Sequence, residues 1–190
     1  FVYHDGDMDG FPFRAGTDID LDPPAVFLRP DFDVGRALPP RAPAVHTDVE
    51  SGLQDLVYNE FYIGEGADVD IVAGCGIHND GGHLTQHDGI HTFYVGKNAR
   101  VRYVEKHVGE GNGSGKRVLN PVTVVHIEED GVLEMETVQI EGVDSTKRVT
   151  KGDLKDRAQL IIKEKLMTSG DQRAETEFAV CLLYTSDAAD

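Results

Sequence analysis

Two stretches of this sequence, 32 residues apart, repeat the same order of residue types: Phe61–Asp70 (FYIGEGADVD) and Phe93–Arg102 (FYVGKNARVR). A further step of 32 residues leads to Val125–Glu134 (VHIEEDGVLE), and a looser copy, Lys155–Leu160 (KDRAQL), follows after about 26 residues. Each copy has the pattern of a strand, a tight turn and a second strand. A unit of this size cannot bury its own apolar face, whereas stacked units share one continuous core.

Around these turns, apolar side chains alternate with charged ones, which is the pattern of strands with one buried face. The residues expected to face the core are Val69, Ile71, Ala73, Val101, Tyr103, Leu133, Met135, Leu160 and Ile162. No segment combines a period of 3.6 with helix caps, so helix is expected to be a minor component. The near-constant spacing favours an all-β solenoid, and a sandwich or cupin-like barrel is the alternative.

The first part of the chain lacks this repetition. Prolines recur from Pro12 to Pro43 and break any helix longer than a turn or two. We therefore expect residues 1–55 to form an irregular, Pro- and Asp-rich N-terminal segment of extended pieces and turns, and residues 56–180 to form the core. Residues 181–190 (CLLYTSDAAD) resemble a translated sequencing adapter and are interpreted as an artefact, so the chain is expected to be a truncated fragment.

Composition narrows the classes of partner. The chain has 34 acidic and 18 basic residues and a formal net charge of −16. Such a charge repels phosphate backbones and anionic lipid, so neither nucleic acid nor a membrane is expected as a partner. Two cysteines, Cys75 and Cys181, do not make a disulfide framework, and this usage fits a reducing, cytoplasmic setting.

The densest reactive group lies between the first two repeats. It consists of Cys75 followed by four histidines: His78, His83, His87 and His91. Thiolate and imidazole are ligands for zinc or iron, so these residues are candidates for a metal site. The alternative is a polar loop whose histidines pair with Asp80 and Asp88. Cys75 itself, flanked by glycines at the end of an apolar strand, is either a reactive thiol or a small buried apolar residue.

Two other motifs carry less weight. Gly109–Arg117 resembles a phosphate-binding loop, but Glu110 stands where the first glycine is required and Arg117 where serine or threonine is required. We interpret this stretch as a connection between coils. Glu134 and Glu136 share one face of a strand, as a glycosidase pair would, but the same spacing is expected of an ordinary solvated face.

Several blocks, in the same order along the chain, resemble the SufB/SufD family of the SUF iron–sulfur cluster assembly system, in particular its shorter members. The blocks are Asn59–Ala67, Ala73–Asn79, His87–His91, Gly96–His107, Leu119–Pro121, Leu133–Glu136 and Gln139–Arg148. The resemblance implies a right-handed parallel β-helix and a scaffold function rather than enzymatic activity. Its implied partners are a SufC-type ABC ATPase, a second SufB/SufD-type subunit in a homo- or heterodimer, and a sulfur donor protein; its implied cargo is a transient iron–sulfur cluster.

The resemblance also bears on single residues. Cys75 matches the family's Gly-Cys position at the end of an early coil, which implies a role as sulfur acceptor. Ser169 stands where a histidine is expected in relatives. The further coils, cluster ligands and helical SufC-docking segment of the family have no counterpart in this sequence. The rival function, a cupin-like metal-dependent enzyme, would use the cluster from His78 to His91.

Overall fold

The computed structural model describes residues 26–30, 36–38, 41–49 and 51–183, and every regular element among them is a β-strand. The strands are β1 (Val26–Pro30), β2 (Arg36–Leu38), β3 (Arg41–Val49), β4 (Gln54–Ile63), β5 (Asp68–His78), β6 (Thr85–Val95), β7 (Arg100–Glu110), β8 (Arg117–Leu119), β9 (Val122–Ile127), β10 (Val132–Gln139), β11 (Ser145–Leu154), β12 (Gln159–Leu166) and β13 (Arg173–Leu182). This part of the chain contains no helix that is long and apolar enough to cross a membrane.

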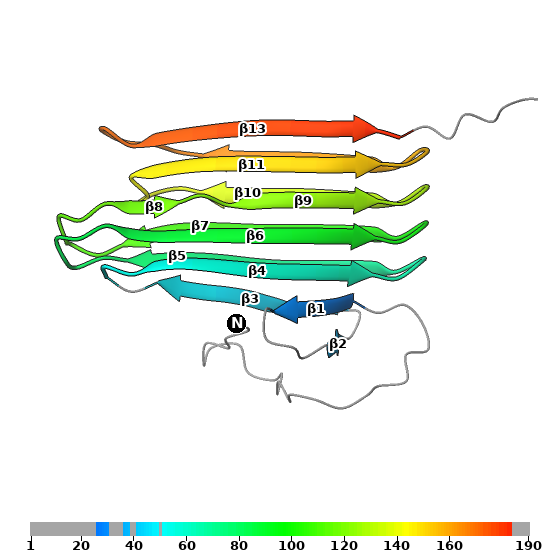
Figure 1. The fold of residues 1–190 in the computed structure, drawn as a ribbon, viewed down its shortest axis with the longest axis horizontal. Coiled ribbons are helices and arrows are strands. Elements are labelled where there is room, and N and C mark those ends of the chain that lie inside the picture. Colours follow the sequence, from blue (N-terminus) through cyan, green and yellow to red (C-terminus); the bar gives the residue numbers. More distant parts are fainter. Residues whose placement is uncertain (1–25, 31–35, 39–40, 50, 184–190) are drawn as a thin grey trace, which may run out of the picture.

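The strands form two facing sheets that the chain visits in turn. One sheet has the order β13-β11-β8-β6-β4-β1-β2, with β9 between β11 and β6, and the other has the order β12-β10-β7-β5-β3. Apart from the antiparallel pairs of β1 with β2 and β4, all pairs are parallel. In Figure 1 the near strands β4, β6, β9, β11 and β13 run to the right, the far strands β5, β7 and β10 run to the left, and the chain rises, which is a right-handed coil. The fold is therefore a parallel β-helix of about four turns, and the antiparallel barrel alternative is excluded.

The repeats of the sequence are the coils of this helix. Phe61 pairs with Phe93, and Phe93 pairs with Val125, which confirms both 32-residue steps. The next coil is shorter, since Val125 pairs with Gly152 and Val132 with Gln159, a step of 27 residues. Near the middle of the stack, Asn120 and Pro121 divide one strand position into β8 and β9, because proline has no N–H for the ladder.

The apolar core fills one half of the space between the sheets. The predicted inward residues of β5, β7 and β10 are all buried. The rings of Phe61 and Phe93 stack with centroids 4.4 Å apart, and Tyr103 meets Phe93 edge-on at 5.0 Å. Since equivalent positions of successive coils lie directly above one another, each core residue packs against its own counterpart.

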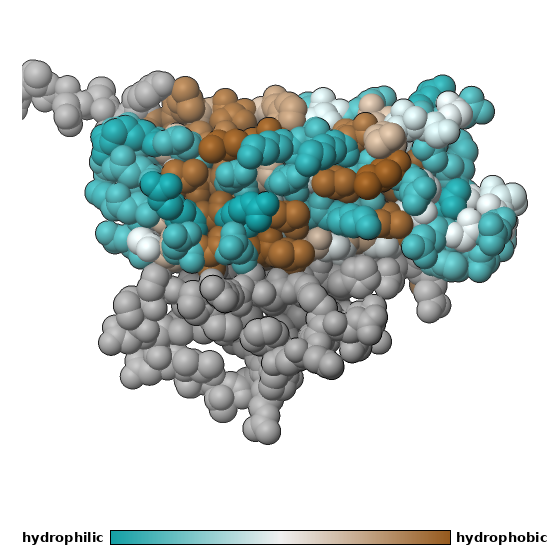
Figure 2. All heavy atoms as spheres, turned by 180° about the vertical axis from the view of Figure 1, so that it is seen from behind, coloured by the Kyte–Doolittle hydropathy of each residue, from teal (hydrophilic) through white to brown (hydrophobic). Residues whose placement is uncertain are grey.

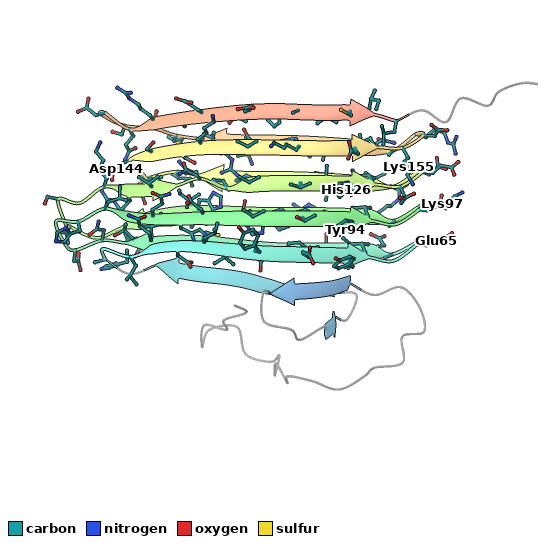
Figure 3. All side chains as sticks on the ribbon, in the orientation of Figure 1. Glu65, Tyr94, Lys97, His126, Asp144 and Lys155 are labelled. Atoms are coloured by element: carbon teal, nitrogen blue, oxygen red, sulfur yellow. The ribbon has the colours of Figure 1, made fainter. Side chains whose placement is uncertain are left out.

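A tight turn joins the two sheets at the same place in each coil. Gly66, Asn98, Asp130 and Arg157 occupy it, all with positive φ. Glycine, asparagine and aspartate tolerate this conformation, which explains why the repeat places them here. Charged neighbours of these residues line up at the coil ends in Figure 3, and Lys97 and Lys155 reach carboxylates of the adjacent coil at 2.7 Å.

Ion pairs between coils also cover the outer faces. Lys163 lies 2.5 Å from Glu134, and Lys165 lies 2.6 Å from Glu136. Glu134 and Glu136 thus belong to a ladder of ion pairs between coils, as expected of an ordinary solvated face. Figure 2 shows hydrophilic residues interrupting the hydrophobic ones over most of the face seen from behind.

Strands extend beyond the predicted core region, residues 56–180, in both directions. The stretch expected to be irregular contains β1, β2 and β3, and β3 already pairs in parallel with β5, so the coil pattern begins before residue 56. Residues 1–25 of that stretch lie outside the described residues. At the other end, Cys181 and Leu182 continue β13, paired with Asp153 and Leu154, while residues 184–190 lie outside the described part.

Candidate functional site

The interior of the β-helix changes from apolar to polar along its strands. In β7, the inward residues Val101 and Tyr103 are followed, still facing inward, by Glu105 and His107. The other sheet contributes further polar residues to the same half of the interior. The buried polar residues of this half include Asn59, His87, His91, Glu105, His107, Thr123, Thr137, Gln139, Thr146, Arg148 and Thr150. Because buried polar groups are costly unless paired, such a concentration marks a candidate site.

Cys75 lies within this polar half. It pairs in register with His107 of the next coil, and both side chains face inward, with exposures of 5% and 1%. Cys75, Glu105 and His107 each offer a ligand atom, and these three atoms lie within 4.8 Å of one another. Among the described residues, three adjacent thiol, imidazole or carboxylate ligands occur in this group.

Arg148, on the inner face of β11, joins this group to the next coil. Its NH1 lies 2.9 Å from His107 Nδ1, its NH2 lies 3.5 Å from Glu105 Oε2, and its Nε donates to Glu164 Oε1 at 3.2 Å. A guanidinium offers a fixed fork of donors, which suits it to holding several partners at once. The buried charges are therefore compensated within the interior.

Glu105 is the centre of the network. Tyr103 donates to its Oε1 at 3.0 Å, and His107 Nε2 lies 3.1 Å from the same oxygen. Burial alone would raise the pKa of Glu105, but the His107 imidazole and the charged Arg148 outweigh it, so the pKa lies well below its ordinary value. Burial, with the Glu105 carboxylate beside it, raises the pKa of the Tyr103 hydroxyl. Glu105 is thus a carboxylate and Tyr103 a neutral donor.

Several buried polar atoms around this network have no hydrogen-bond partner. They are Asn59 Oδ1, both ring nitrogens of His91, His107 Nε2 and Gln139 Oε1. A buried polar group without a partner costs about 1–3 kcal/mol, so such atoms are uncommon in native proteins. Here they all lie on the inner faces that surround Cys75 and Glu105.

The four predicted metal-binding histidines do not converge. His87 and His91 lie on the inner face of β6, whereas His78, at the end of β5, and His83, in the following loop, are exposed. His78 pairs with Asp80 at 2.8 Å, as the polar-loop interpretation predicts. His87 Nδ1 lies 3.2 Å from Asp55, and His91 Nε2 lies 3.7 Å from Glu105. Burial lowers the pKa of both His87 and His91.

The remaining sequence motifs lie away from this site. Residues 111–116 of the phosphate-loop-like stretch connect β7 to β8, as predicted for a connection between coils. Ser169 lies in the exposed turn before β13, where its amide N–H donates to Gln172 Oε1 at 2.9 Å. Neither feature contributes to the polar interior.

Sequence reasoning missed Glu105, His107 and Arg148. The signal was present, because continuing the alternation of Val101 and Tyr103 places Glu105 and His107 on the inner face. The 32-residue step leads from Cys75 to His107 in the same way. Arg148 was harder to foresee, since the shorter coil shifts its register and charged residues are seldom fully buried.

Comparisons with protein-family models, with curated proteins and with solved structures gave no significant match.

Proposed function

We propose that this chain is part of a scaffold of the SUF type, on which an iron–sulfur cluster is assembled in the cytoplasm, and that Cys75 accepts sulfur for this purpose. The observation that carries the proposal is the position of Cys75, whose thiol lies inside the coil stack beside His107 and Glu105. The ordered sequence blocks that resemble SufB/SufD proteins supply the functional context, and a parallel β-helix is the fold that this resemblance implies.

The proposed step is a transfer of sulfane sulfur. The Cys75 thiolate attacks the outer sulfur of a cysteine persulfide on a donor protein; the donor's S–S bond breaks, a new S–S bond forms at Cys75, and the donor leaves as a thiolate. Oxidation states balance without a further reductant or oxidant. Cys75 pairs in register with His107, and an adjacent imidazole is a common neighbour of reactive cysteines.

The other partners follow from the same proposal. A SufC-type ATPase supplies ATP hydrolysis, which accords with the failed phosphate-loop pattern around Lys116, and a second SufB/SufD-type subunit completes the scaffold. The rival proposal, a cupin-like enzyme, loses its basis because the strands are parallel and His78 and His83 are exposed.

Co-expression of the protein encoded by the intact gene with a SufC-type ATPase, followed by anaerobic reconstitution with ferrous iron and sulfide, tests the assignment. We expect the two chains to co-purify and the complex to develop the visible absorption of an iron–sulfur cluster. Absence of both co-purification and cluster uptake, with the chain folded, would overturn it. Cys75→Ser should reduce sulfur delivered by a desulfurase, while Cys181→Ser serves as the matched control.

A further inference from the structure

We propose that the interior of the β-helix holds a divalent transition-metal ion, bound by Cys75 Sγ, the Glu105 carboxylate and His107 Nε2. The three side chains come from adjacent strands, β5 and β7, and their ligand atoms already lie within 4.8 Å of one another. Ligands of one tetrahedral zinc or iron ion lie about 3.5 Å apart, given bonds of about 2.0–2.3 Å. Small rotations of these side chains toward one another therefore complete the site.

The unpaired atoms support a ligand at this place. His107 Nε2 is buried without a hydrogen-bond partner and faces Glu105 Oε1 at 3.1 Å. His91, also buried, has no partner for either ring nitrogen, and its Nε2 lies 3.7 Å from the same oxygen. A metal ion beside Glu105 would provide the missing partner of His107 Nε2. His91 Nε2 would then be the candidate for a fourth ligand.

The donor set selects the class of metal. One thiolate, one or two imidazoles and one carboxylate suit Zn²⁺, Fe²⁺ and Co²⁺, whereas Mg²⁺ and Ca²⁺ require oxygen ligands. The rings of Phe61 and Tyr103 pack near His91, with centroids 6.2 Å and 6.3 Å from that of the imidazole.

Arg148 opposes the metal and thereby sets its affinity. When His107 Nε2 binds a metal, the ring hydrogen is on Nδ1, so the hydrogen bond from Arg148 NH1 at 2.9 Å has to break. Arg148 keeps its contact with Glu164, 3.2 Å away, and stays beside the site. The site is therefore expected to bind a metal more weakly than a structural zinc site without a neighbouring cation.

Cobalt titration of the full chain tests this site independently of the scaffold assignment, because it requires neither sulfur transfer nor an ATPase. Since the site is buried, Co²⁺ is added during refolding under anaerobic, thiol-free conditions. We expect one equivalent of Co²⁺ to bind, with a thiolate-to-cobalt charge-transfer band in the near ultraviolet. Cys75→Ser, a change of one atom, should abolish the band, and His107→Gln should weaken binding by at least about tenfold.

Two variants outside the site are matched controls: Cys181→Ser removes the exposed cysteine, and His78→Gln removes an exposed histidine. Both should leave the band and the affinity unchanged. A folded wild-type chain without the band, a band that survives Cys75→Ser, or one that disappears in Cys181→Ser would each overturn the proposal. If His107→Gln does not fold, circular dichroism will show it, and the Cys75→Ser result decides.

Discussion

Cys75 and His107 occupy paired positions on consecutive coils, and both side chains face the closed interior of the β-helix. In a stack of coils, a residue meets the residue at its own position one coil later, as Phe61 meets Phe93 in the apolar half. The same geometry that stacks two phenyl rings thus places a thiol beside an imidazole. The polar chamber is a consequence of the repeat, with different residues at the repeated positions.

Replacing Arg148 by methionine should strongly destabilise the chain. The substitution leaves the Glu105 carboxylate buried without its permanent cation, which typically costs about 3–5 kcal/mol. Urea unfolding monitored by circular dichroism measures the free energy of unfolding. Lys97→Met is the control, since it removes an exposed ion pair with Glu129 and should change stability little. Equal effects of the two substitutions would refute the compensating role of Arg148.

Gly109→Ala should destabilise the chain by a different mechanism. A methyl group at Gly109 would overlap the carbonyl group of Gly142 on the neighbouring coil, so the backbones have to separate. Gly66→Ala is a matched control, because Gly66 has a positive φ of 66° but nothing within 4 Å of the added carbon. We expect a loss above about 2 kcal/mol at Gly109 and about 1 kcal/mol at Gly66. The reverse order would show that close coil contact is not the constraint.

The stability should fall as the pH is lowered through the range where histidine titrates. Burial lowers the pKa of His87 below its ordinary 6.5, despite the opposing Asp55 carboxylate; His107 and Glu105 of β7 also act on it. The unfolded chain therefore takes up a proton that the folded chain resists, and stability present above about pH 6.5 declines below it. One such group contributes at most about 1.4 kcal/mol per pH unit.

Urea midpoints at several pH values between 7.5 and 5.5 check this dependence. The free energy of unfolding of the wild type should decrease as the pH falls over this range. That of His87→Gln should decrease less steeply. Other groups titrate in both chains, so the informative quantity is the difference between the two slopes. Parallel curves for the two chains would contradict the burial effect at His87.

We expect the chain to self-associate through its last coil. A hollow of about 470 Å³ lies between β12 and β13, and its lining is mostly apolar, including Leu160, Phe178 and Val180. β12 and β13 end their sheets among the described residues, so their outer edges are open for pairing. Sizing chromatography should show concentration-dependent oligomers, and Phe178→Glu should reduce them. A monodisperse wild-type monomer over the same concentrations would contradict this expectation.

The sequence alone was sufficient to predict the fold for a physical reason. A solenoid repeats its turn, so the glycine at position 66 and the asparagine at 98 recur at the spacing of the coil. The alternation of buried and exposed residues then identifies the inner face. The shorter step to β11 and β12 was harder to place, since its connections have a different length.

The site was only partly predictable. Cys75, His87 and His91 were recognised from residue type, but His83 lies before β6 begins at Thr85, so its spacing of four to His87 has no structural meaning. Glu105 and His107 escaped notice because charged residues on a strand are usually taken as solvent-facing. In a stack of coils the alternation rule, and not the polarity of the residue, decides which side a residue faces.

Sulfur mapping tests the central claim most directly. Since Cys75 is buried in the folded chain, the chain is refolded anaerobically in the presence of cysteine and a cysteine desulfurase, and each cysteine is then examined by mass spectrometry for an added sulfur atom. The account predicts an added sulfur atom on the interior Cys75 in the wild type and in the Cys181→Ser variant. In the Cys75→Ser variant, no sulfur should be added at position 75. Sulfur found solely on the exposed Cys181, or on neither cysteine of the folded chain, would contradict it.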